Sequence, residues 1–99
     1  MDIRIGSPTY GCWEGYELSS ENGHQLYIPV GFAHGFVVLS ESAILTYKVD
    51  NYYAPNYDRG IAFNDEKLKI DWKFSVEQLQ FSAKDKTHPS LANAIDLFN

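Results

Sequence analysis

The chain has 99 residues, a length that accommodates one domain and no more. Its apolar share of 44% and aromatic share of 15% are enough to build a core, which excludes a disordered tail. The formal net charge of −5 argues against a nucleic-acid surface, because phosphate binding needs clustered lysine and arginine.

The sequence carries no signal that predicts a membrane or an oxidising compartment. Its longest apolar stretch, near 36–45, is broken by polar residues and is far shorter than the roughly 18 residues that span a bilayer. The N-terminal residues lack the charged-then-apolar pattern of a signal peptide. The single cysteine, Cys12, cannot form an internal disulfide, which fits a reducing compartment. We therefore expect a cytoplasmic protein without a membrane partner.

Turn signals and short apolar runs alternate along the first two thirds of the chain. Residues 19–23 predict a hairpin turn, and residues 25–29 form a short apolar run that ends in proline. Strands are predicted at 36–39, at 43–49 and at 61–63. Along 43–49 the side chains at 44, 46 and 48 alternate with those at 45, 47 and 49. This succession of short strands and turns favours a β-sandwich or barrel.

The end of the chain differs in character from the rest. Residues 90–98 predict a terminal helix with Ser90 as its N-cap. The predicted fold is therefore mostly β, with a short C-terminal helical tail. We find about five or six strands, whereas a closed barrel usually needs about eight. We expect an incomplete fold, whose unpaired edge another segment or another chain completes.

The most specific stretch of the chain surrounds His34. The spacing G-x5-P-x-G-x2-H, which resembles the second cupin motif, is formed by Gly23, Pro29, Gly31 and His34. Val38 replaces the asparagine that ends this motif, and the first cupin motif, with its two histidines and glutamate, is absent. One histidine does not make a metal site, so we expect no metal and no cofactor. The structural alternative is a turn histidine whose ring is satisfied by backbone carbonyls.

Several separated motifs keep the order and spacing found in the dTDP-4-dehydrorhamnose 3,5-epimerase family. They lie at 2–11, 28–36, 47–48, 52–55, 70–72 and 82–85. From residue 2 to about residue 91 the chain therefore resembles the C-terminal part of this family. The resemblance implies a cupin-like jelly roll, in which residues 1–99 form the C-terminal part of a single epimerase domain.

The resemblance also implies a proton-transfer chemistry, of the type that converts dTDP-4-keto-6-deoxyglucose into dTDP-4-keto-rhamnose. Hydrogens at C3 and C5 flank the C4 ketone, so removal of either one gives an enolate. In the family the base is a histidine held by an aspartate, the acid is a tyrosine, and a lysine helps to carry the enolate charge. The implied partners are a dTDP-sugar substrate and further copies of the chain, in a homodimer or another homo-oligomer.

The resemblance assigns roles to five residues of this chain. Tyr47 matches the catalytic acid, and Asp85 matches the aspartate that orients the histidine base. His34 and Tyr53 match substrate-binding residues, with Tyr53 near the nucleotide base. Asp2 stands where the family has an aspartate near its lysine, and we assign it to substrate binding as well. A phenol with an ordinary pKa near 10 is protonated at pH 7, so a tyrosine can deliver a proton.

Each assignment has a structural alternative. Tyr47 alternates on a predicted strand and can belong to the core, while Tyr52 and Tyr53 can simply cover their loop. Asp85 forms a Ser-x-x-Asp capping pattern with Ser82, which predicts a local role at a helix start.

The family's histidine base, its lysine and a diphosphate-binding arginine all lie upstream of the motif at 2–11. Neither His24 nor His88 stands in a context that matches the base. We therefore predict that these residues alone do not epimerise, because loss of a general base costs a factor of about 10² to 10⁴ in rate. The alternative functions are a non-catalytic nucleotide-sugar-binding module and a small metal cupin.

Overall fold

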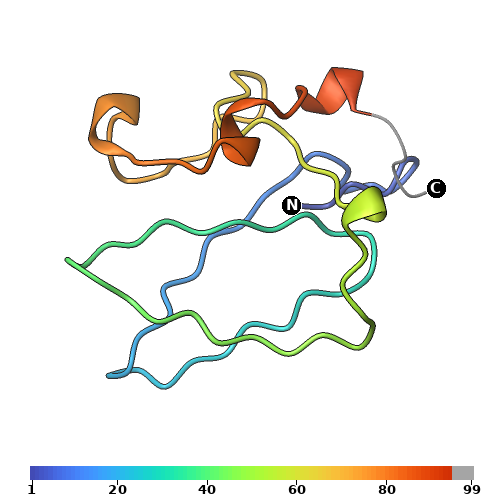
Figure 1. Ribbon diagram of the computed structural model, residues 1–99. Helices are drawn as coiled ribbons and strands as arrows, with labels where there is room; N and C mark the ends of the chain where they lie inside the picture. The colour runs from blue at the N-terminus through green and yellow to red at the C-terminus, as the bar shows by residue number, and fades with distance from the viewer. Residues whose placement is uncertain (95–99) are drawn as a thin grey trace.

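The structure is a computed structural model that describes residues 1–94, apart from the side chains of Tyr57 and Val76. Its helices are single 3-10 turns, all in the C-terminal part of the chain (Figure 1). They are η1 (Pro55–Tyr57), η2 (Val76–Gln78), η3 (Lys84–Lys86) and η4 (Leu91–Asn93). Over residues 1–94, no helix is long and apolar enough to cross a membrane.

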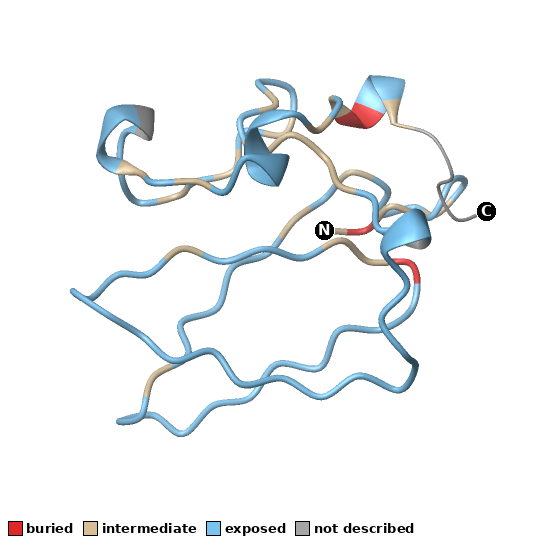
Figure 2. Cartoon of the chain, viewed as in Figure 1, coloured by how far each residue is buried: buried red, intermediate tan, exposed pale blue. Residues whose placement is uncertain are grey.

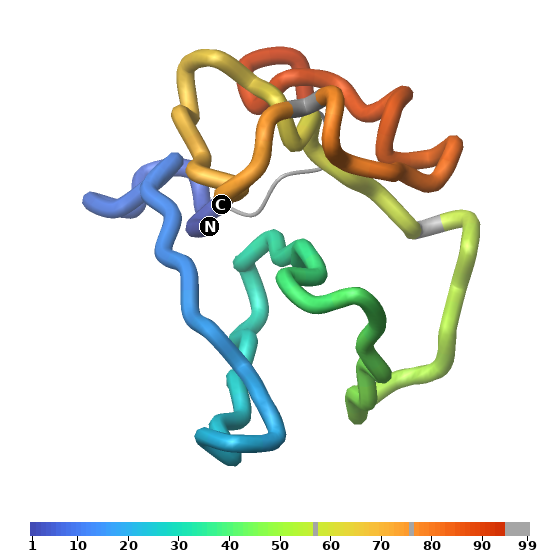
Figure 3. The backbone as a smooth tube through the Cα atoms, turned by 90° about the vertical axis from the view of Figure 1, so that its left-hand side faces the viewer, coloured from blue at the N-terminus to red at the C-terminus, as the bar shows by residue number. Residues whose placement is uncertain are grey.

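The prediction of a mostly β, cupin-like jelly roll or sandwich is wrong for this structure. Residues 1–94 contain no strand, and their named β pairing is an isolated antiparallel bridge between Asp2 and Phe32. From residue 34 to residue 54, the backbone makes no backbone–backbone hydrogen bond to any described residue. These residues run through open excursions in both views of the chain (Figures 1 and 3). A strand needs a hydrogen-bonded neighbour, and alternation in the sequence does not supply one.

The turn that the sequence predicts at residues 19–23 is present. Gly23 N donates to Ser19 O over 3.0 Å, and Asn22 N donates to Ser19 Oγ over 3.0 Å. Gly23 and Gly31 have φ angles of +64° and +91°, which glycine adopts without a Cβ clash. The turn at 19–23 is thus confirmed, although the described residues form no strand ladder on either side of it.

The N-terminal segment lies against residues 31–33. Ile3 N donates to Gly31 O over 3.0 Å, and Ala33 N donates to Met1 O over 2.9 Å. The Asp2–Phe32 bridge lies between these two bonds. The first residues of the chain therefore fix the residue that precedes His34.

An aromatic cluster organises residues 61–81. The Phe63 ring stacks on Phe81 with centroids 4.3 Å apart, and Trp72 meets Phe63 edge-on at 6.4 Å. The indole N–H of Trp72 donates to Phe63 O over 2.8 Å. Trp13 ties this cluster to the N-terminal segment, because its indole N–H donates to Leu68 O over 3.0 Å.

The predicted terminal helix at 90–98 is present only as the short turn η4, and its last residues lie outside the described residues. Ser90 precedes η4 in an extended conformation, but its side chain makes no capping hydrogen bond. The capping acceptor is Asp65 instead, whose Oδ2 accepts a 2.9 Å hydrogen bond from Leu91 N. Leu91 itself is buried, with 9% of its surface exposed, and it packs near Gly11.

The chain buries little of its surface. Its accessible area is 8848 Å², whereas a folded monomer of 11.3 kDa exposes about 5,700 Å². The radius of gyration is 14.2 Å, against about 12.6 Å for a compact domain of this length. Large apolar side chains such as Ile44 and Tyr52, each 96% exposed, face solvent, and most of the chain is coloured as exposed in Figure 2. Exposed apolar surface of this extent is typical of an interaction site or of a surface that aggregates.

Candidate functional site

The structure separates the five predicted site residues into two groups and one isolated side chain. Asp2 and His34 belong to the region where the N-terminal segment meets residues 31–33. Tyr53 and Asp85 belong to a group of charged side chains around η3. Tyr47 lies between these groups in the sequence, within the open excursion at 34–54.

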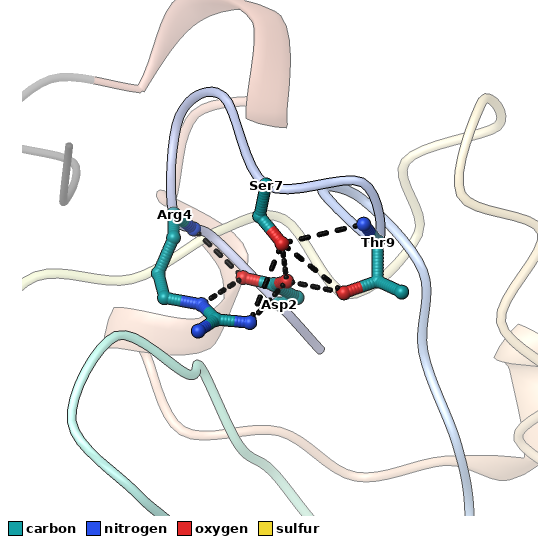
Figure 4. Close-up of polar contacts among 4 residues, drawn as sticks. All are labelled: Asp2, Arg4, Ser7 and Thr9. Atoms are coloured by element: carbon teal, nitrogen blue, oxygen red, sulfur yellow. Dashed lines mark hydrogen bonds and ion pairs between the residues drawn. The ribbon is translucent and has the colours of Figure 1, made fainter.

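Asp2 is buried, and its carboxylate is saturated by donors from its own chain (Figure 4). Its Oδ1 accepts hydrogen bonds from Arg4 N at 2.9 Å and Arg4 Nε at 3.0 Å. Its Oδ2 accepts from Arg4 Nη2 at 2.9 Å, Ser7 Oγ at 2.6 Å and Thr9 Oγ1 at 2.6 Å. The hydrogen bonds from Arg4 lower the pKa of Asp2 far below its usual range against the opposing effect of burial, and the two hydroxyls lower it further. Asp2 is therefore ionised, and both of its carboxylate oxygens already accept hydrogen bonds from this chain.

Arg4 is a residue that the sequence reading did not single out. Its guanidinium carbon lies 4.9 Å from the centroid of the Phe32 ring, in cation–π contact. Its methylene groups cover Gly31 so closely that a Cβ at Gly31 would lie 2.6 Å from Arg4 Cγ. The hydrogen bonds to Asp2 raise the pKa of Arg4. The feature of the sequence that could have indicated Arg4 is the Asp-x-Arg spacing, which allows a bidentate ion pair between residues two apart.

The second group surrounds η3. Lys84 Nζ forms an ion pair with Asp58, and Tyr53 lies near enough to Lys84 to contribute to its raised pKa. The bond to Asp58 raises the pKa of Lys84, and the same bond lowers the pKa of Asp58. His88 Nε2 lies 3.8 Å from Asp85 Oδ1, which is too long for a hydrogen bond, and His88 is not the histidine that the resemblance pairs with Asp85.

Part of the capping pattern predicted for Asp85 is present in the structure. Its backbone N–H donates to Ser82 Oγ over 3.3 Å, but the N-cap of η3 is Ala83, and no side chain caps this turn. This contact uses the backbone and leaves the carboxylate 57% exposed beside His88. The two interpretations therefore involve different atoms of the same residue.

Tyr47 and His34 are both exposed, and Tyr47 retains 75% of its surface. Tyr47 is therefore not a core residue here. Neither side chain has a hydrogen bond, ion pair or ring contact with another residue in the range 1–94. Two surface hollows are lined by residues within 15–24 and within 63–75, and none of the five predicted site residues lines either one. Among the described residues, no group of three histidine, cysteine, aspartate or glutamate side chains could hold a metal ion.

Comparison with known proteins gives this arrangement its context. A family model described as dTDP-4-dehydrorhamnose 3,5-epimerase matches residues 1–93. The chain is 52% identical over 95 residues to the dTDP-4-dehydrorhamnose 3,5-epimerase of Salmonella typhimurium, covering 96% of the chain and 51% of that protein. It is 50% identical over 94 residues to the enzyme of the same name from Pseudomonas aeruginosa, covering 95% and 51%. No solved structure matches the chain.

A more distant relative carries a narrower name. The dTDP-4-dehydrorhamnose 3-epimerase of Streptomyces niveus is 38% identical over 96 residues, covering 97% of the chain and 45% of that protein. The matches define the class of the chain as a homologue of sugar-nucleotide epimerases. It belongs to the dTDP-4-dehydrorhamnose 3,5-epimerase family, which confirms the resemblance found in the sequence. The chain spans about half the length of the curated relatives it matches.

Proposed function

We propose that this chain supplies part of the active site of a nucleotide-sugar 3,5-epimerase, an isomerase that converts dTDP-4-keto-6-deoxyglucose into dTDP-4-keto-rhamnose. The observation that carries the proposal is the family match over residues 1–93. The 52% identity to the Salmonella typhimurium protein agrees with it. The positions epimerised are taken from the names of relatives, and the substrate is the one that the family resemblance implies.

The proposed reaction removes a proton from C3 or C5 of the sugar and returns one to the opposite face. The adjacent C4 ketone stabilises the resulting negative charge as an enolate, which makes these hydrogens acidic enough for a general base. Tyr47 is the proposed acid, since a phenol is protonated at neutral pH and its exposed side chain can reach a bound ligand. His34 and Tyr53 are the proposed substrate contacts, and Asp85 is proposed to orient the base histidine.

The base and the enolate lysine are proposed to come from outside these residues, in the same domain or in a partner chain. Two observations support this. The chain spans about half the length of its relatives. Its accessible area exceeds that of a compact monomer by about 3,100 Å², well above the roughly 800 Å² that each partner buries in an interface of standard size. We accordingly propose that residues 1–99 alone are inactive, and that the enzyme which also contains the base and the lysine is a homo-oligomer.

The test is solvent exchange in D2O with dTDP-4-keto-6-deoxyglucose, read by mass spectrometry, alongside calorimetric titration with dTDP. We expect no deuterium at C3 or C5 with this chain alone and saturable binding of dTDP. The Salmonella typhimurium relative serves as the positive control for exchange. Deuterium incorporation by the chain alone would contradict the external base. Absence of both binding and exchange would contradict the proposed function.

A chimera makes the assignment of Tyr47 testable. Residues 1–93 of this chain replace the matching stretch of the Salmonella typhimurium relative, and exchange is measured again. We expect the chimera to be active and Tyr47→Phe to lower its rate by about 10² or more. Tyr27→Phe, at an 86% exposed tyrosine outside the proposed site, is the matched control. Equal rates for the two variants would remove Tyr47 from the mechanism.

A second candidate is a non-catalytic nucleotide-sugar-binding module. The observation in its favour is that Tyr53 is engaged by Lys84 near Asp85, while Tyr47 has no contact with either predicted group in the described chain. An inactive chimera that still binds dTDP would favour this candidate over the epimerase.

A further inference from the structure

We propose that Asp2 and Arg4 form a clamp that positions His34 by fixing the backbone of residues 31–33. In this role Asp2 and Arg4 are positioning residues, which act on the ligand site through His34 and do not themselves touch the ligand. The consequence for ligand binding rests on the function proposed above. The clamp itself is a property of the chain and can be tested separately.

The clamp acts where the chain leads into His34. Ile3 N donates to Gly31 O over 3.0 Å, and Ala33 N donates to Met1 O over 2.9 Å, so both flanks of Phe32 are fixed. His34 is the next residue along the chain. Its own side chain has no hydrogen bond to any residue of the range 1–94, so the backbone that precedes it is what sets the position of its Cα and the direction of its Cα–Cβ bond.

The Asp2 carboxylate holds Arg4 in one conformation. Three hydrogen bonds, at 2.9, 3.0 and 2.9 Å, join the backbone N, Nε and Nη2 of Arg4 to the two carboxylate oxygens. Only 3% of the Asp2 side-chain surface is exposed, so water and salt have little access to the carboxylate and weaken the pair less than they would at the surface. Ser7 and Thr9 donate to the same carboxylate and prevent it from turning away (Figure 4).

Arg4 in turn holds residues 31 and 32. Its charged end lies over the face of the Phe32 ring at 4.9 Å, and its methylene groups lie against Gly31. Gly31 has a φ of +91°, a conformation that ordinary residues avoid, and it leaves the space that the arginine stem fills. The arginine therefore contacts two consecutive residues immediately upstream of Ala33 and His34. A lysine could reach the carboxylate but could not donate in the same two-pronged way.

The structure offers a matched pair for comparison. Asp71 and Lys73 have the same spacing as Asp2 and Arg4, and their ion pair is 3.5 Å long. Both of these side chains are more than half exposed, at 63% and 65%, and within residues 1–94 the hydrogen bonds and the ion pair of Lys73 go to Asp71 alone. Removing Lys73 therefore removes an equivalent charge without touching the clamp.

The test is amide hydrogen exchange on the 99-residue chain, followed residue by residue by NMR. With Arg4→Ala we expect the amides of Ile3 and Ala33 to exchange faster by about tenfold or more, because an opened clamp exposes both bonds. Arg4→Lys should recover part of the protection, and Lys73→Ala should match the parent chain. The amide of Ala62, which donates to Pro89 O over 2.7 Å, reports whether the whole chain has unfolded.

Each outcome is decisive for one part of the inference. Unchanged exchange at Ile3 and Ala33 in Arg4→Ala overturns the clamp. Equal acceleration at Ala62 means that Arg4 supports the fold as a whole, and it overturns the local positioning role unless Arg4→Lys, which keeps the charge, shows the local effect alone.

Titration with dTDP separates the clamp from the proposed function. We expect Arg4→Ala to bind dTDP about tenfold more weakly than the parent chain, with a displaced His34 signal, and Arg4→Lys to lie between them. Equal affinity of parent and Arg4→Ala, with Ala33 exchange accelerated, overturns the link to His34. A parent chain that does not bind dTDP contradicts the proposed function and leaves the exchange result to decide the clamp.

Discussion

Gly31 lets the Arg4 side chain lie close to the backbone, and the substitution Gly31→Ala tests this close contact. In Gly31→Ala, the new Cβ would lie 2.6 Å from Arg4 Cγ and 2.9 Å from Arg4 Cδ. Arg4 cannot move aside freely, because Asp2 holds its guanidinium. The substitution also places alanine at a φ of +91°. Two separate penalties therefore act at one position.

The magnitudes of these penalties follow from the geometry. An alanine forced into positive φ costs about 1–2 kcal/mol. Overpacking against a held side chain adds about 1–3 kcal/mol. We expect Gly31→Ala to lower the free energy of unfolding by about 2–5 kcal/mol in total. Gly6 provides the control, because its φ is +86° and no atom lies within 4 Å of an added Cβ. Gly6→Ala should show only the conformational part.

Urea unfolding followed by tryptophan fluorescence measures these losses, since Trp13 is bonded to Leu68 O across the fold. When Arg4 is already alanine, adding Gly31→Ala should cost only the conformational part, because the side chain that the new Cβ would clash with is gone. A double-mutant cycle of the two substitutions therefore isolates the steric part. If Gly31→Ala and Gly6→Ala destabilise the chain equally, Arg4 does not hold its position over Gly31, and the argument for the clamp fails with it.

Three further predictions concern acid stability, the core and association. Arg4 holds the pKa of Asp2 far below its ordinary value of 3.8, so the stability that Asp2 contributes is complete above pH 3.8 and is lost as the pH falls below it. In a series of unfolding experiments from about pH 6 to about pH 2, Asp2→Asn should therefore reduce the loss of stability at the acid end. An unaltered acid limb in Asp2→Asn would contradict this sign. Leu91→Ala should cost about 2–3 kcal/mol because it empties a buried site, whereas Leu45→Ala, at a 52% exposed position, should change the unfolding free energy by less than about 0.5 kcal/mol; equal losses would show that Leu91 is not packed. Sedimentation velocity should detect species heavier than the 11.3 kDa monomer, since the accessible area is far above that of a compact chain, and a clean monomer at about 100 µM would refute that inference.

Local features of this chain could be predicted from its sequence. The turn at 19–23 follows from residues whose side chains bond their own backbone, and the Asn22 side chain does so, accepting from Ser19 N over 3.1 Å. The Ser82 contact to Asp85 N is likewise a local pattern read over three residues. The family was identified from separated motifs whose order and spacing are properties of sequence alone.

Features that depend on distant partners could not be predicted in the same way. Alternation at 43–49 indicates which side chains share a face, but a strand also needs a neighbour, and the described residues provide none there. Ser90 matches an N-cap by residue type, yet the acceptor for Leu91 N is Asp65, which is remote in sequence. Arg4 was missed for the same reason, since its importance lies in contacts with Phe32 and Gly31 that only the folded chain brings together.

The absence of backbone–backbone hydrogen bonds between residues 34 and 54 of the described chain has a thermodynamic consequence for any binding partner. Ordering a residue costs about 1–2 kcal/mol of backbone entropy, and only short-range contacts such as Tyr52 N to Asn51 Oδ1 hold this backbone. A ligand or chain that settles on it must therefore offset an entropy loss that grows with each residue it orders. Calorimetry of such an event should show an unfavourable entropy, together with a negative heat-capacity change as Ile44 and its exposed neighbours leave water. Association with this chain would then be a folding reaction as much as a docking reaction.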